Sequence, residues 1–211
     1  MRSDFARIAR NAMYYFFAQG AARIIGFVYI LFLARVLPEA DFGYLTLALA
    51  ILVIADTAAD LGLSRLALRE VSQDGAKTSH YLGALIPLRV MTSFAAYAIV
   101  LAYIGTTGYP TIMVQLTAIA GIGLLFTGPS MLTEAALQSH QKFLLISIAH
   151  MALSILQATS GVAIVLMGGG AVAIATTFSL TNLLYLIIVV LGVRRLNFHI
   201  RPNLDTAFWR D

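Results

Sequence analysis

The sequence contains no cysteine, one tryptophan and few charged residues. Without cysteine the chain has no disulfide, no thiol nucleophile and no cysteine-based metal site. Charged residues make up 11% of the chain and hydrophobic residues 60%, whereas soluble domains carry about 25% charged residues. The mean hydropathy is +0.85. This composition excludes an ordinary soluble domain and predicts a protein embedded in a membrane.

Two long stretches lack Asp, Glu, Lys and Arg entirely. One covers the 51 residues between Lys142 and Arg194, and the other covers the 44 residues between Arg89 and Glu134. A helix rises about 1.5 Å per residue, so roughly 20 apolar residues cross a bilayer core of about 30 Å. Each stretch therefore accommodates two spans, with turns at 105–110 (GTTGYP) and 168–170 (GGG). The pattern predicts an all-α polytopic membrane protein.

The whole chain predicts six transmembrane helices. We expect them at residues 12–37, 42–63 (with 70 as an alternative end), 80–104, 112–136, 143–167 and 171–193. Residues 1–11 form a short amphipathic cytoplasmic N-terminus, 12–193 one six-helix lobe, and 194–211 a basic cytoplasmic tail or linker. The basic start resembles a signal peptide, but the apolar run after it is too long and contains Arg23, which indicates an uncleaved first span.

Most Lys and Arg residues fall on one side of these six spans. Eleven of the fourteen do so: Arg2, Arg7, Arg10, Arg65, Arg69, Lys77, Lys142, Arg194, Arg195, Arg201 and Arg210. On the other side there is Arg35 alone. The positive-inside rule therefore places both termini in the cytoplasm. The net charge of +4 is interpreted as a topology signal facing anionic lipid, not as a nucleic-acid-binding surface.

The predicted spans keep a few charged and amide side chains inside the lipid. Arg23 lies near mid-membrane with Gln19 one turn earlier, and the adjacent sequence offers no acidic residue at its depth. Because a buried charge is costly, Arg23 should face protein or water. Arg23 and Gln19 are therefore candidates for substrate binding.

Asp56 and Asp60 are four residues apart, and Arg89 lies at a depth similar to that of Asp60. Two interpretations remain open. In one, Arg89 pairs with an aspartate and fixes helix packing. In the other, Arg89 assists substrate binding while Asp56 and Asp60 couple to a cation.

The charge-free helices are expected to supply packing and lipid-facing wall, with the substrate-handling face in the first half of the chain. Gly128-Pro129 predicts a kink, more often static than a hinge. His150 and Gln157 share a helix face, which favours interhelical hydrogen bonding over a proton relay. Paired-histidine metal motifs, phosphate-binding glycine loops and Gly-x-Ser-x-Gly elbows are all missing. We therefore expect no metal, no cofactor and no enzymatic activity.

Two blocks carry a family resemblance. Residues 34–44 read ARVLPEADFGY, and residues 59–65 (ADLGLSR) are followed by LREV at 68–71. In order and spacing they resemble the first loop and second helix of bacterial polysaccharide flippases. These are oligosaccharide and O-antigen (lipopolysaccharide) exporters of the multidrug/oligosaccharidyl-lipid/polysaccharide superfamily. The similarity is clearest over residues 1–90, and Leu37 replaces the glycine that often precedes this proline.

The resemblance implies a two-lobe fold of which this chain is the N-terminal lobe. It implies transport of an isoprenoid-diphosphate-linked glycan across the bacterial cytoplasmic membrane. The second six-helix lobe would come from a missing C-terminal half or from another chain. In this interpretation Arg23 attracts the diphosphate, with Arg89 assisting, while Asp56 and Asp60 hold the arginines or couple to a cation.

Three other interpretations remain open. The chain could be half of a multidrug/cation antiporter that uses Asp56 or Asp60. It could be a non-transporting membrane assembly subunit, which predicts that Arg23, Arg89, Asp56 and Asp60 are all paired. It could also be a membrane glycosyltransferase, for which Glu134 or Asp60 would be the catalytic carboxylate.

Overall fold

The computed structural model describes residues 2–73 and 78–195, and the side chains of these except 2–12 and 14. Within these ranges every element is a helix and no strand is present. The helices are α1 (Arg2–Val36), α2 (Glu39–Asp60), α3 (Leu63–Gln73), α4 (Thr78–Thr106), α5 (Thr111–Ser139), α6 (Phe143–Leu166) and α7 (Ala171–Arg194). The predicted all-α class is confirmed.

Six of these helices are long and apolar enough to cross a membrane. They are α1 from Tyr15 onward, α2, α4, α5, α6 and α7, each of 22 to 29 residues. Their ends agree with the predicted spans to within a few residues, because Gly- and Pro-containing turns interrupt the apolar runs. The chain is a multi-pass membrane protein.

The second predicted helix differs from the structure at its end. α2 stops at Asp60 because Leu61 and Gly62 adopt positive φ angles of 48° and 81°, which a right-handed helix does not allow. The alternative end at residue 70 is therefore wrong. Instead, α3 begins at Leu63 as a separate helix and extends to Gln73. At the N-terminus, α1 is one continuous helix from Arg2, and the boundary expected at residue 11 stays a prediction.

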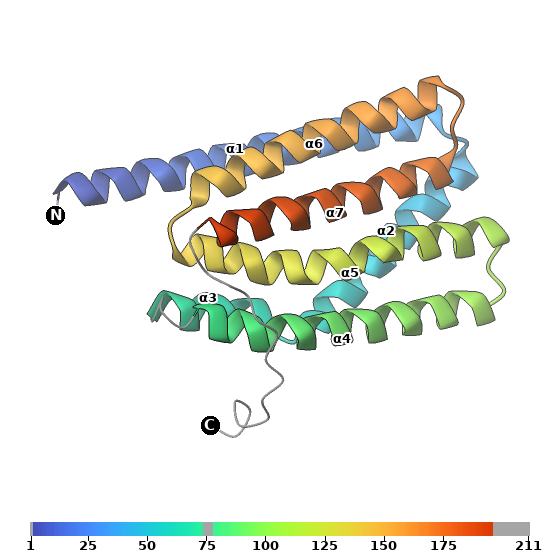
Figure 1. Cartoon of the computed structure of the whole chain (residues 1–211). Helices are drawn as coiled ribbons and strands as arrows, with labels where there is room; N and C mark the ends of the chain where they lie inside the picture. The colour runs from blue at the N-terminus through green and yellow to red at the C-terminus, as the bar shows by residue number, and fades with distance from the viewer. Residues whose placement is uncertain (1, 74–77, 196–211) are drawn as a thin grey trace.

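The long helices form an elongated bundle (Figure 1). α1 packs on α6, α7 packs on α5, and α4 lies beside α5, with α2 running obliquely behind α5. The α1–α2, α4–α5 and α6–α7 connections gather at one end, which we call the loop end. At the opposite end, the basic end, lie α3, the α5–α6 turn and the last turn of α7, with Arg65, Arg69, Lys142, Arg194 and Arg195. The positive-inside rule predicts that the basic end faces the cytoplasm.

α5 is the central helix of the bundle. It contributes to both hydrophobic clusters, with Leu116 in one toward the loop end and Leu132 in the other toward the basic end. Small residues let neighbouring helices approach, as is common in membrane bundles. At Gly161 of α6, for example, a Cβ atom would collide with the ring and hydroxyl of Tyr29 from α1.

Candidate functional site

A cleft separates α1 from α2. The two helices meet at the turn between them and otherwise make few contacts. Three adjoining cavities of 390, 340 and 290 Å³ lie in and beside this space, and Phe178 of α7 lines all three. Both α1 and α2 line the first cavity, α1 but not α2 lines the second, and α2 but not α1 lines the third. We call these the apolar, polar and Asp56 cavities, and together the α1/α2 cleft.

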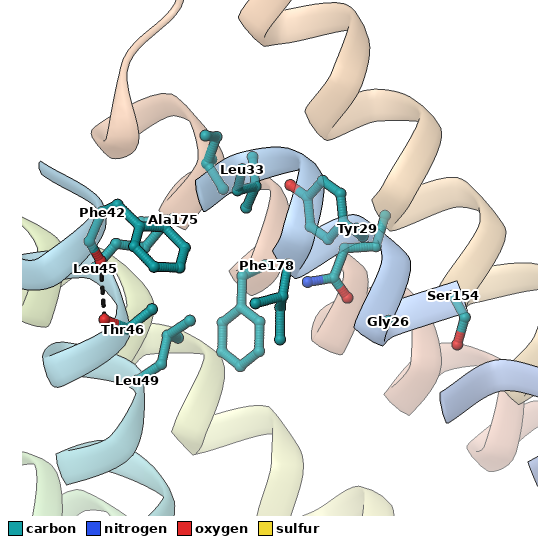
Figure 2. A pocket seen from close by; sticks show the side chains of 13 residues that line it. Gly26, Tyr29, Leu33, Phe42, Leu45, Thr46, Leu49, Ser154, Ala175 and Phe178 are labelled. Atoms are coloured by element: carbon teal, nitrogen blue, oxygen red, sulfur yellow. Dashed lines mark hydrogen bonds between the residues drawn. The ribbon is translucent and has the colours of Figure 1, made fainter. Parts of the chain in front are cut away.

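The apolar cavity lies toward the loop end. Its walls are Gly26, Tyr29, Ile30 and Leu33 of α1 and Phe42, Leu45, Thr46 and Leu49 of α2, with Ser154, Gln157, Ile174, Ala175 and Phe178 completing it. In Figure 2, Tyr29 and Phe42 come from opposite walls, with Phe178 between them. The Thr46 hydroxyl is occupied within its own helix, since it donates to the Phe42 carbonyl at 2.9 Å. This cavity suits a hydrocarbon chain.

The polar cavity adjoins it on the side of the basic end. Four helices contribute its lining: Gln19 from α1; Thr127, Ser130, Met131 and Glu134 from α5; His150, Leu153, Ser154 and Gln157 from α6; and Phe178, Thr181, Asn182 and Tyr185 from α7. Amide and hydroxyl groups beside aromatic rings are the groups that bind a polyhydroxylated ligand by hydrogen bonds and stacking. Three of the four helices are those expected to be packing and lipid-facing wall. These helices do supply packing, but they also line the polar cavity, which the expectation did not include.

A carboxylate-centred cluster lies at the basic-end side of this cavity. Glu134 accepts hydrogen bonds from the Tyr185 hydroxyl at 2.5 Å and from the Gln138 amide at 2.9 Å. The Nε2 atom of His150 lies 3.3 Å from the same carboxylate and 2.8 Å from the Tyr185 oxygen. The Tyr15 hydroxyl, 3.5 Å from Glu134, brings in α1. The cluster therefore ties four helices together and confirms the interhelical hydrogen bonding predicted for His150.

Arg89 forms a second polar network with α2. Its side chain is fully buried, and Nη2 lies 2.5 Å from Oδ1 of Asp56 while Nε lies 3.6 Å from Oδ1 of Asp60. Nη1 donates to the Ser93 hydroxyl at 3.0 Å. Gly128 of α5 makes room for this arrangement, since a Cβ there would lie 2.8 Å from Arg89 Nε. The geometry matches the packing interpretation of these charges. A substrate role for Arg89 stays a prediction.

Arg23 has a different environment. Gln19, Arg23 and Gly26 are spaced by four and three residues, so they share one face of α1. Gln19 lines the polar cavity and Gly26 lines the apolar cavity, whereas Arg23 shares their helix face without lining either cavity itself. Its side chain is exposed, and none of the residues whose side chains the structure describes pairs with it. The structure therefore leaves its charge available to a ligand.

Sequence reasoning named Gln19, His150 and Gln157, which line the polar cavity, but it missed other residues that make the cleft polar. Glu134 entered only as a carboxylate of the rival glycosyltransferase interpretation, and Tyr15 and Tyr185 not at all. Tyr185 is 35 residues from His150 and 51 from Glu134, so helix spacing carries no signal for these contacts. Across residues 2–73 and 78–195, no three His, Asp or Glu side chains group as metal ligands.

Comparison with known proteins places the chain in a family. The sequence model of the family described as "Polysaccharide biosynthesis protein" matches residues 8–210. Searches of the curated proteins and of the solved structures give no significant match. The family match confirms the resemblance seen in residues 34–44 and 59–71 and extends it over nearly the whole sequence. The chain belongs to the polysaccharide biosynthesis protein family.

Proposed function

We propose that the chain is one lobe of a transporter that moves an isoprenoid-diphosphate-linked oligosaccharide across the bacterial cytoplasmic membrane. We propose transport in preference to catalysis. The family and the six spans support a membrane step in polysaccharide synthesis. The observation that carries the proposal is the α1/α2 cleft, in which an apolar cavity adjoins a polar one, with Arg23 on the same face of α1 as Gln19 and Gly26, which line them.

The parts of such a substrate correspond to the parts of the cleft. The apolar cavity, with Tyr29, Leu33 and Phe42, offers hydrocarbon surface to the isoprenoid chain. The guanidinium of Arg23 offers paired donors to the diphosphate, a geometry that lysine lacks. The amides of Gln19 and Asn182 offer hydrogen bonds to sugar hydroxyl groups.

A second six-helix lobe, from a C-terminal half or another chain, would complete the transporter. The two lobes would then rock around the substrate, as in other transporters built from repeated halves. In this arrangement Asp56 and Asp60 hold Arg89 and stiffen the lobe.

Two rival functions make different predictions. A non-transporting assembly subunit predicts that all four intramembrane charges are paired, but Arg23 has no partner among the side chains described. A multidrug/cation antiporter half gains support from Asp56, which lines a cavity of the cleft. It predicts that small cationic drugs compete with the substrate and that Asp56→Asn abolishes drug export while glycan export continues.

The proposal is tested by changing Arg23 in cells whose surface polysaccharide depends on this chain. We expect Arg23→Ala to lower surface polysaccharide about tenfold or more, since a charge-assisted hydrogen bond contributes about 1.5–3 kcal/mol. Arg23→Lys should recover part of the loss. The matched control is Arg35→Ala, an exposed arginine at the loop end of the same helix, which should resemble wild type. Unchanged export by Arg23→Ala at normal protein level would refute the role of Arg23.

A further inference from the structure

We propose that Glu134, His150 and Tyr185 form an intramembrane proton-binding site that is loaded at Nδ1 of His150 from the polar cavity. The site belongs to the floor of the α1/α2 cleft, where α5, α6 and α7 meet. Its ligand is a single proton.

The first step is the position of the hydrogen atoms in the cluster. Glu134 Oε2, His150 Nε2 and the Tyr185 oxygen form a triangle with sides of 2.5, 2.8 and 3.3 Å. The phenol has one hydrogen and a carboxylate has none. If Nε2 also had none, its lone pair would face the carboxylate oxygen directly. With Glu134 ionised, Nε2 therefore carries a hydrogen.

The groups around Glu134 favour its ionised form. Tyr185 and His150 approach Oε2, while Gln138 and Tyr15 approach Oε1 at 2.9 and 3.5 Å. Four donors converging on two oxygens suit an ionised carboxylate, which has acceptors only.

The second nitrogen of His150 is the entry point. With Nε2 protonated, Nδ1 of a neutral imidazole has a free lone pair. Nδ1 makes no hydrogen bond to any group in the described part of the chain, and the His150 side chain is 29% exposed and lines the polar cavity. A proton passes from water in the cleft to Nδ1 and returns by the same path. The loaded site is an imidazolium–carboxylate pair, and its net charge rises from −1 to zero.

Among the described residues, the ionisable groups near the cluster do not offset this change of net charge from −1 to zero. From α1, the Tyr15 hydroxyl lies 3.5 Å from Glu134, and the exposed Arg23 makes no contact with the cluster among the described side chains. Asp56 and Asp60 of α2 are occupied by Arg89 of α4. In α3, Glu70 accepts a hydrogen bond from Tyr81 and pairs with Arg69, and the exposed Arg65 makes no recorded contact with the cluster. Within the described ranges, no charged group from α2, α3 or α4 contacts Glu134 or His150.

Proton loading should change how the cleft receives an anion, a step that rests on the proposed function. The unloaded site adds a negative charge to the floor beneath the sugar- and phosphate-binding groups. Loading removes that charge. The proton and the anionic ligand therefore each bind more tightly when the other is already bound. The coupling is reciprocal, and anion binding draws a proton onto His150.

The first experiment measures the proton directly, without any transport. The full chain with ¹⁵N-labelled histidine is reconstituted in phosphatidylcholine nanodiscs, and His150 is identified among the four histidines by its loss in His150→Gln. We expect the neutral Nε2–H tautomer at pH 8 and imidazolium at pH 5.5. A neutral Nδ1–H tautomer at pH 8, or a ring still neutral at pH 5.5, overturns the proposal.

Variants then test the carboxylate. Glu134→Gln should abolish most of the His150 imidazolium signal at pH 5.5. The matched control is Glu39→Gln, an exposed acidic residue at the loop end of α2, which should leave the signal unchanged. If Glu134→Gln does not fold, Tyr185→Phe provides the test, because His150 should retain Nε2–H against the remaining carboxylate. A switch to Nδ1–H in Tyr185→Phe, or an unchanged imidazolium signal in folded Glu134→Gln, contradicts the proposal.

The second experiment separates the proton site from the proposed function. Inorganic diphosphate is added to nanodiscs in weak buffer at pH 6.5, and proton uptake is followed with a pH-sensitive dye. We expect proton uptake of less than one proton per chain, lost in His150→Gln and kept in His140→Gln, whose ring lies outside the cleft at the C-terminal end of α5. The two experiments can give different answers. If His150 gains a proton in the first experiment but adding diphosphate causes no proton uptake in the second, the proton site stands and the substrate proposed for the cleft is contradicted.

Discussion

At the scale of single residues, the strongest polar contacts of the lobe surround Arg89. Burying a guanidinium with two carboxylates inside a helix bundle costs free energy, and burying these charges with one partner missing costs more. Asp56 and Asp60 come from one turn of α2, and Arg89 comes from α4. Loss of the arginine would therefore strand two negative charges between helices.

We expect Arg89→Met to destabilise the folded lobe by about 3–5 kcal/mol, the usual penalty for breaking a buried ion pair. The double variant Arg89→Met/Asp56→Asn should recover part of that loss. Thermal unfolding in detergent measures both. A double variant that restores stability and also supports polysaccharide export would exclude the substrate role predicted for Arg89. An Arg89→Met protein as stable as wild type would contradict the structure of the network.

The residues of the site were predictable only where their partners lie in neighbouring helices. Pairing of Arg89 with an aspartate was one of two open interpretations, because both fall at similar depth in consecutive spans. The contact between Glu134, His150 and Tyr185 was not predictable, since it depends on how α5, α6 and α7 pack. Arg23 stood out from its depth alone, and the structure adds its place beside the cleft.

At the scale of elements, the break between α2 and α3 shows how two residues end a helix. Leu61 occupies the left-handed region at φ 48°, where a side chain costs about 1–2 kcal/mol, and Gly62 follows at φ 81°. The sequence predicted the six spans well, because long apolar runs are compatible with no structure other than a membrane-spanning helix. It did not reveal α3 as a separate helix, because residues as far as 70 were expected only as an alternative continuation of the second span.

We therefore expect Leu61→Gly to raise stability by about 1 kcal/mol, because glycine adopts positive φ without steric cost. Leu61 is 72% exposed, so little packing is lost. Gly62→Ala should lower stability by a similar amount. The control Gly43→Ala lies on an exposed part of α2 with open space around it and should raise stability, opposite in sign to Gly62→Ala, because alanine has the higher helix propensity. Thermal unfolding of the three variants decides, and a destabilised Leu61→Gly would contradict the assigned break.

At the scale of the whole molecule, the bundle has one basic end and one end of short turns. This division follows from the sequence, because alternating spans place Lys and Arg at every second connection. The cleft does not follow from it, since no local pattern reveals that α1 and α2 separate along their length.

The orientation of the bundle is open to direct measurement, because the absence of native cysteine allows single-cysteine labelling. A membrane-impermeant maleimide should label Gly170→Cys, at the loop end, in intact cells. Lys142→Cys, exposed at the basic end, should react only after the membrane is permeabilised. The reverse pattern would contradict the predicted cytoplasmic position of the basic end.

The central claim is that the α1/α2 cleft holds a lipid-linked glycan, and Phe178 is the residue to test it because it lines all three cavities. Photoreactive benzoylphenylalanine in place of Phe178, irradiated in cells that make surface polysaccharide, should capture an isoprenoid-diphosphate glycan detectable by mass spectrometry. The same group in place of Phe94, exposed on α4 and outside the three cavities, should capture ordinary phospholipid. Glycolipid bound equally at both positions, or phospholipid alone at Phe178, would contradict the account.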